Sequence, residues 1–146
     1  MIFLVAVSIF ILDRVTKYIA VNCLIQGQSV QVVQNIFHFT LVQNSGAAFG
    51  LFRGGTTVFV FLSLLVIAFI MLYAFKHKTK DMIASIALGL VLGGAIGNLL
   101  DRIRLGYVID FLDFRVWPVF NIADSAISVG ATVLVLRILF QTKEQG

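Results

Sequence analysis

The chain has 146 residues, of which 60% are hydrophobic and 12% charged, and its mean hydropathy is +1.01. This composition lies far from that of soluble globular domains and excludes a protein with an ordinary polar surface. The net charge of +4 does not indicate nucleic-acid binding, because the basic residues flank apolar segments and form no basic face with stacking aromatics. The sequence predicts an integral membrane protein.

Four stretches are apolar enough to cross a bilayer as helices, which takes about 20 residues each. They lie at about 1–25, 57–75, 82–100 and 119–140. We expect an all-α membrane protein forming a single domain over 1–146, with four transmembrane helices. The first stretch has no basic leader and no small-residue cleavage site, so we expect a retained span rather than a cleaved signal peptide.

The segment between the first two spans is predicted to form a small extracytoplasmic β-hairpin on the membrane surface. Residues 28–44 mix β-branched and aromatic side chains with glutamines at near-alternating spacing, and Gln34 and Asn35 make a plausible turn. His38 fits one face of this hairpin better than a catalytic role. The following sequence NSGAAFG, residues 44–50, is small enough for close backbone approach to another element or an extended ligand.

The orientation follows from the short link between the second and third spans. Its sequence, KHKTKD at 76–81, holds three lysines, and lysine-rich short loops stay in the cytoplasm. Both termini are then cytoplasmic, and the loops after the first and third spans lie outside.

Polar side chains gather toward the outer ends of the first, third and fourth spans. Asp13 and Lys17 have i, i+4 spacing and share a helix face. The remaining members come from GGAIGNLLDR, YVIDFLDF and FNIADS; they are Asn98, Asp101, Arg102, Asp110, Asp113, Asn121 and Asp124. Gly94 shares a helix face with Asn98 and Asp101. We interpret Asp13 with Lys17, and Asp101 with Arg102, as structural ion pairs. Asp113, near Arg115 in a surface segment, is interpreted as a solvated charge.

Asp110 and Asp124 differ, since neither has a basic residue at i±3 or i±4 and both lie in apolar runs. Unpaired carboxylates in a membrane are functional candidates. Two carboxylates close together in a low-dielectric site share a proton and supply a base and an acid, as in aspartic proteases. This chemistry leaves two functions open, an aspartyl hydrolase and a proton- or ion-coupled transporter. Spacing alone also leaves open whether Asp101 or Asp110 partners Asp124.

The cytoplasmic half of the spans helps to distinguish the hydrolase from the transporter. The second span is uncharged, and the fourth is almost wholly apolar from Asp124 to Arg137, whereas a transporter needs polar groups reaching both faces. The sequence therefore favours the hydrolase. The lone Cys23 excludes an intramolecular disulfide, and without a cluster of His and Cys we expect no metal and no cofactor.

The motifs LDRVTK, NSGAAFG, GGAIGNLLDR, YVIDF and FNIADSAISVG, in this order over nearly the whole chain, resemble those of bacterial lipoprotein signal peptidase, also called signal peptidase II. The resemblance implies a four-helix aspartyl endopeptidase with a small extracytoplasmic β-cradle. Its catalytic pair would be Asp110 and Asp124. The residues implied to line the substrate groove or support the pair are Asn44, Gly46, Ala48, Phe49, Gly94, Asn98, Asp101, Arg102, Asn121 and Ala123, with Asp13 and Lys17 bracing the first span.

The resemblance also implies partners and a location. The substrate would be a prolipoprotein whose lipobox cysteine carries a diacylglyceryl group, and cleavage would occur before that cysteine. The enzyme would work as a monomer among the lipids of the bacterial cytoplasmic (inner) membrane, with its active site toward the outer face. It would bind no nucleic acid and would be inhibited by globomycin-type peptide antibiotics.

Overall fold

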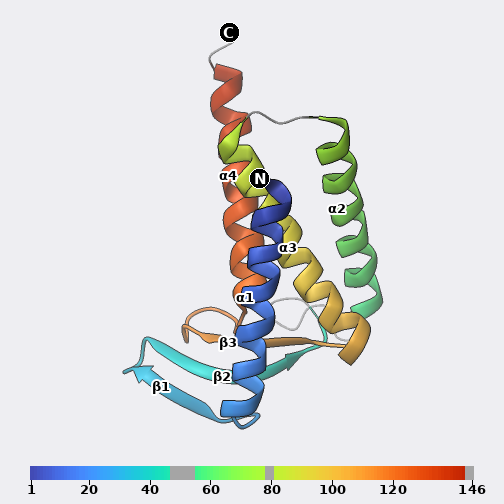
Figure 1. Cartoon of the computed structure of the whole chain (residues 1–146). Helices are drawn as coiled ribbons and strands as arrows, with labels where there is room; N and C mark the ends of the chain where they lie inside the picture. Colours follow the sequence, from blue (N-terminus) through green and yellow to red (C-terminus); the bar gives the residue numbers. More distant parts are fainter. Residues whose placement is uncertain (47–54, 78–80, 144–146) are drawn as a thin grey trace.

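The computed structural model describes residues 1–46, 55–77 and 81–143, and these form four helices and a three-stranded sheet (Figure 1). The helices are α1 (Ile2–Cys23), α2 (Thr56–Lys76), α3 (Met82–Leu105) and α4 (Ile122–Lys143). The strands are β1 (Ser29–Val33), β2 (Phe37–Asn44) and β3 (Val108–Asp113). The sheet lies where α1 and α3 end and where α2 and α4 begin, and both chain termini lie at the opposite end.

The predicted helical membrane protein with a small sheet is confirmed at this level. Among the described residues, α2, α3 and the stretch Ile122–Phe140 of α4 are long and apolar enough to cross a membrane. α1 is of similar length, but it carries Asp13, Arg14 and Lys17 in its middle. The structure therefore supports three apolar spans directly.

α3 is the central helix and packs against α1, α4 and α2. Its glycines allow two of these contacts to be unusually close. A Cβ atom on Gly93 would lie 2.5 Å from the carbonyl oxygen of Ala6 in α1, and one on Gly94 would lie 2.5 Å from that of Ala123 in α4. Such distances are too short for any larger residue, so glycine sets the spacing of α3 from both neighbours.

The predicted hairpin is confirmed, with β1 and β2 antiparallel and Asn35 in the left-handed region at φ 58°. The turn Gln34–Asn35 therefore connects the strands where the sequence placed it. A third strand was missed. β3 pairs antiparallel with β2, and the register sets Val42 opposite Asp110 and His38 opposite Asp113.

β3 also overturns the interpretation of Asp113 as a solvated charge. Its side chain is buried, accepts hydrogen bonds from Thr40 Oγ1 at 2.8 Å and from the Arg115 backbone at 2.8 Å, and pairs with the Arg115 guanidinium at 3.1 Å. Although burial opposes it, these hydrogen bonds lower the pKa of Asp113. The pairing of Asp113 with its sequence neighbour Arg115 follows from the sequence, but the strand β3, which places Asp113 against Thr40 of β2, does not.

Candidate active site

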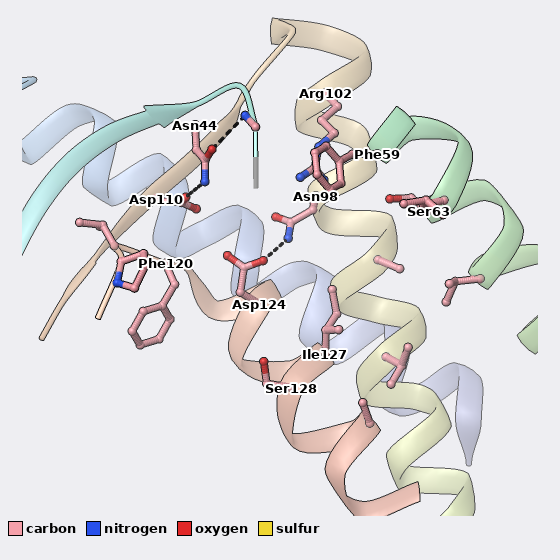
Figure 2. A pocket seen from close by; sticks show the side chains of 18 of the residues that line it. Asn44, Phe59, Ser63, Asn98, Arg102, Asp110, Phe120, Asp124, Ile127 and Ser128 are labelled. Atoms are coloured by element: carbon pink, nitrogen blue, oxygen red, sulfur yellow. Dashed lines mark hydrogen bonds between the residues drawn. The ribbon is translucent and has the colours of Figure 1, made fainter. Parts of the chain in front are cut away.

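A pocket of about 620 Å³ opens beside the sheet and extends between α2 and α4 (Figure 2). Its polar end holds Asn44 of β2, Asp110 of β3, Asp124 of α4 and Asn98 of α3. Its walls along α2, α3 and α4 are mostly apolar, through Leu62, Val66, Val91, Ala95, Ile127 and Ala131. The pocket thus joins a polar end to an apolar cleft within the bilayer-spanning part of the protein.

Asp110 is 1% exposed and is held by two amide donors. Asn44 Nδ2 donates to its Oδ2 at 2.9 Å, and Asn121 Nδ2 donates to its Oδ1 at 2.6 Å. Burial and the nearby Asp124 carboxylate raise the pKa of Asp110 to about 7, against the lowering effect of these hydrogen bonds. The raised pKa makes Asp110 easier to protonate than an ordinary aspartate.

Asp124 is positioned by the first turn of α4. Asn121 precedes the helix, and its Oδ1 accepts the backbone N–H of Asp124 at 2.9 Å. In return Asp124 Oδ2 accepts the backbone N–H of Asn121 at 3.3 Å. This reciprocal pattern is a capping box with Asn and Asp in place of the usual Ser and Glu. It explains why Asn121 and Asp124 stand three residues apart at the start of an apolar helix.

Asparagines connect the two carboxylates. Asn98 Nδ2 donates to Asp124 Oδ1 at 2.7 Å. Asn121 Nδ2, which donates to Asp110, also donates to Asn98 Oδ1 at 3.1 Å. Asn98 and Asn121 are 3% and 0% exposed, and burial strengthens the hydrogen bonds between these amides. The amides hold Asp110 and Asp124 at the same end of the pocket.

A buried ion cluster lies next to this network and includes Asp101. The predicted pair of Asp13 with Lys17 is present, with Lys17 Nζ 3.1 Å from Asp13 Oδ1. The predicted pair of Asp101 with Arg102 is wrong. Asp101 instead pairs with Arg14 at 2.5 Å and with Lys17 at 2.7 Å. Residues adjacent on a helix point about 100° apart, so Asp101 faces α1 while its neighbour faces elsewhere.

Arg102 lines the pocket, and its guanidinium lies over the Phe59 ring at 5.1 Å. Arg14 was not selected from the sequence, although it pairs with both Asp13 and Asp101. The sequence feature that points to Arg14 is its place within LDRVTK, between Asp13 and Lys17. Phe59 and Ser63 of α2 also line the pocket, and nothing in the uncharged second span marked them beforehand.

The remaining candidates fall into place around the pocket. Gly46 lines it, and its N–H donates to Asn44 Oδ1 at 3.0 Å. Gly94 packs on Ala123, which is fully buried and donates its backbone N–H to Asp13 Oδ1 at 3.3 Å. Ala48 and Phe49 lie outside the described residues.

Comparison with known proteins agrees with the resemblance. A family model described as signal peptidase (SPase) II matches residues 5–140. A lipoprotein signal peptidase of Halothermothrix orenii is 41% identical over 143 residues, 98% of each chain. That of Moorella thermoacetica is 44% identical over 144 residues, 98% of this chain and 95% of the relative.

Solved structures give the same result. One, described as a bacterial membrane enzyme, is 31% identical with a TM-score of 0.92 and covers 99% of this chain and 91% of its own. A second, described in the same way, is 32% identical with a TM-score of 0.84, over 94% and 92% of the two chains. Sequence and fold match over almost the whole chain, and we conclude that it belongs to the signal peptidase II family of membrane proteases.

Proposed function

We propose that this protein is an intramembrane aspartyl endopeptidase that removes the signal peptide from diacylglyceryl-modified prolipoproteins and cuts before the lipid-modified cysteine. The observation that carries the proposal is the placement of Asp110 and Asp124 at the polar end of a pocket whose other walls are apolar helices. Family membership supports the protease activity, and the names of the relatives support the substrate.

The chemistry requires one protonated and one ionised carboxyl group. Its raised pKa suits Asp110 to carry the proton that the pair shares. The ionised carboxylate takes a proton from water as the water oxygen attacks the scissile carbonyl carbon. The protonated carboxyl group gives its proton to the leaving amine, and the dyad is left with one proton again. Asp101 already forms ion pairs with Arg14 and Lys17, which supports Asp110 as the partner of Asp124.

The apolar cleft suits a substrate that stays in the membrane. The pocket runs from the dyad between α2 and α4, along Leu62, Val66 and Ala131. A lipid-anchored peptide is held in the bilayer by about 0.8 kcal/mol for each buried CH₂ group. Entry from the bilayer would bring its scissile bond to the dyad at the membrane surface.

The proposal includes four spans in the cytoplasmic membrane of a bacterium, with both termini inside. α1 completes the four spans, because its ionic residues are paired. Asp13 and Lys17 are 0% and 2% exposed. Arg14, whose side chain is 24% exposed, pairs with Asp13 and Asp101. The lysines of the link 76–81 set the orientation. A single chain forms the whole pocket described, which supports action as a monomer.

The test is cleavage of a purified diacylglyceryl-modified prolipoprotein, followed by the release of its signal peptide. Asp124→Asn and Asp110→Asn should each lower kcat at least about a hundredfold, since an amide cannot exchange a proton. Asp113→Asn is the matched control, because Asp113 lies on the same strand as Asp110 but pairs with Arg115. It should keep activity within about threefold of the wild type, as expected for a residue outside the chemistry.

Other outcomes would contradict the proposal in distinct ways. Near-normal turnover in either dyad variant removes that residue from the dyad. Equal cleavage of modified and unmodified peptide removes the lipid recognition. Ion flux in proteoliposomes that depends on both aspartates, without cleavage, would establish a transporter instead. A globomycin-type peptide should compete with the substrate for the pocket.

A further inference from the structure

The ion cluster beside the pocket contains two acids and two bases. Lys17 contacts Asp13 at 3.1 Å and Asp101 at 2.7 Å, and Arg14 pairs with the same two aspartates. Lys17 is 2% exposed. Buried ion pairs of this kind are often no more stable than the apolar residues that could replace them. Stability alone therefore does not account for a buried lysine at this position.

Lys17 makes one contact that Arg14 does not. Its Nζ donates to Asn98 Oδ1 at 2.9 Å, and Asn121 Nδ2 donates to the same oxygen at 3.1 Å. Two donors therefore face Oδ1, and the amide nitrogen of Asn98 is directed to Asp124 Oδ1 at 2.7 Å. If the amide turned over, its N–H groups would meet the ammonium of Lys17, and its oxygen would meet a carboxylate. Lys17, together with Asn121, thus favours the orientation of Asn98 in which its amide nitrogen faces Asp124.

We infer that Lys17 is a positioning residue of the dyad: through Asn98 it keeps a hydrogen-bond donor on Asp124, and its charge helps to keep one carboxylate of the pair ionised. The inference rests on the proposed function and assigns to Lys17 a role beyond bracing α1. A donor facing a carboxylate favours the ionised form, whereas an oxygen facing it favours the protonated form.

The charged groups around the dyad come from four elements. α1 contributes Asp13, Arg14 and Lys17, and α3 contributes Asp101 and Arg102; the dyad itself is on β3 and α4. Burial and Asp124 raise the pKa of Asp110, and the charge of Lys17 lowers it. Loss of Lys17 leaves two cluster carboxylates with one cation. Ionisation within the dyad then requires a higher pH, so the acid limb of the activity profile moves upward.

The experiment compares Lys17→Met with Arg14→Met by measuring kcat and KM for the lipid-modified prolipoprotein across pH. Both changes remove one positive charge from the same cluster, but only the first removes the contact to Asn98. We expect Lys17→Met to lower kcat at neutral pH about tenfold or more, as losses of orienting partners do. Its KM should stay within about twofold, and its acid limb should rise by about one pH unit, the lower end of the effect of a nearby opposite charge.

Arg14→Met should lower the melting temperature about as much as Lys17→Met does. It should shift the acid limb of the activity profile less than half as far as Lys17→Met does. If Lys17→Met fails to accumulate, Lys17→Met combined with Asp101→Asn restores charge balance in the cluster and should show the same loss of kcat. A kcat and pH profile equal to those of Arg14→Met would overturn the inference while leaving the protease intact. Absence of cleavage by the wild type, or full activity of Asp124→Asn, would instead defeat the proposed function and this inference with it.

Discussion

Three asparagines donate hydrogen bonds to the two carboxylates at the polar end of the pocket. Asn44 of β2 and Asn121, which precedes α4, donate to Asp110, and Asn98 of α3 donates to Asp124. The amides contribute about 1.5–3 kcal/mol for each bond to a carboxylate, but burial and the neighbouring Asp124 outweigh them. The amides therefore orient Asp110 without fixing it in the ionised state, and its pKa remains about 7.

This raised pKa predicts how stability depends on pH. Between the ordinary value of 3.8 and about 7, Asp110 holds a proton in the folded protein but not in the unfolded chain. The folded state is thus favoured at low pH, and that contribution is lost as pH rises through 7. From about pH 5 to pH 8 the free energy of unfolding of the wild type should fall by on the order of 1–3 kcal/mol. That of Asp110→Asn should not show this fall.

The measurement is the melting temperature of both proteins in detergent over that pH range. As the pH rises, the melting temperature of Asp110→Asn should increase relative to that of the wild type. This trend is expected whichever of the two proteins is more stable at pH 5. Parallel pH curves for the two would show that Asp110 does not carry a raised pKa.

At the scale of elements, the contact between α3 and α4 sets the distance from Asn98 to Asp124. Gly94 lies one turn before Asn98, and a Cβ atom there would meet Ala123 O at 2.5 Å and Ile127 Cγ1 at 2.8 Å. Ala123 directly precedes Asp124, so any separation of the two helices at this level moves the carboxylate away from its donor.

Gly94→Ala should therefore lower both stability and activity. The overpacking should cost about 1–3 kcal/mol of unfolding free energy, and displacement of Asp124 should lower kcat about tenfold or more. Gly89→Ala is the matched control. Its Cβ would meet Ile2 O at 2.7 Å, a contact that is also too close, against the start of α1 and away from the dyad.

Melting temperature and kcat measured on the same preparations separate the two effects. We expect similar losses of stability from both variants and a loss of kcat only from Gly94→Ala. Equal losses of kcat would mean that general loosening of the bundle, rather than the position of Asp124, limits catalysis.

At the scale of the molecule, the sheet closes one end of the helices and both termini lie at the other (Figure 1). Thr56 Oγ1 donates to Gly106 O at 2.9 Å, which joins the start of α2 to the end of α3 at the sheet end. The polar end of the pocket lies at this same end of the helices, where Asn44 of β2 and Asp110 of β3 line it.

The proposed orientation predicts that the hairpin turn is outside. Gln34 is exposed at that turn, so Gln34→Cys in a Cys23→Ser background should react with a membrane-impermeant maleimide added to intact spheroplasts. A fluorescent protein fused to the C-terminus should fold and fluoresce in the cytoplasm. Labelling of Gln34→Cys only after membrane disruption would reverse the orientation.

The sequence by itself determined the features that depend on local composition and spacing. Runs of about 20 apolar residues place the helices, because a bilayer demands that length. Alternating β-branched residues around Gln34 and Asn35 place the hairpin. The selection of Asp110 and Asp124 followed from the absence of basic residues at helical spacing, and the ordered motifs identified the family.

Only the tertiary structure decided which side chains meet across elements. Asp101 pairs with Arg14 and Lys17, 87 and 84 positions before it, rather than with its neighbour Arg102. β3 forms on β2 some 70 residues upstream, which buries Asp113 and brings Asp110 to Asn44. Such partners are chosen by helix packing and strand register, which depend on the whole fold, whereas spacing reports only what one element presents on each face.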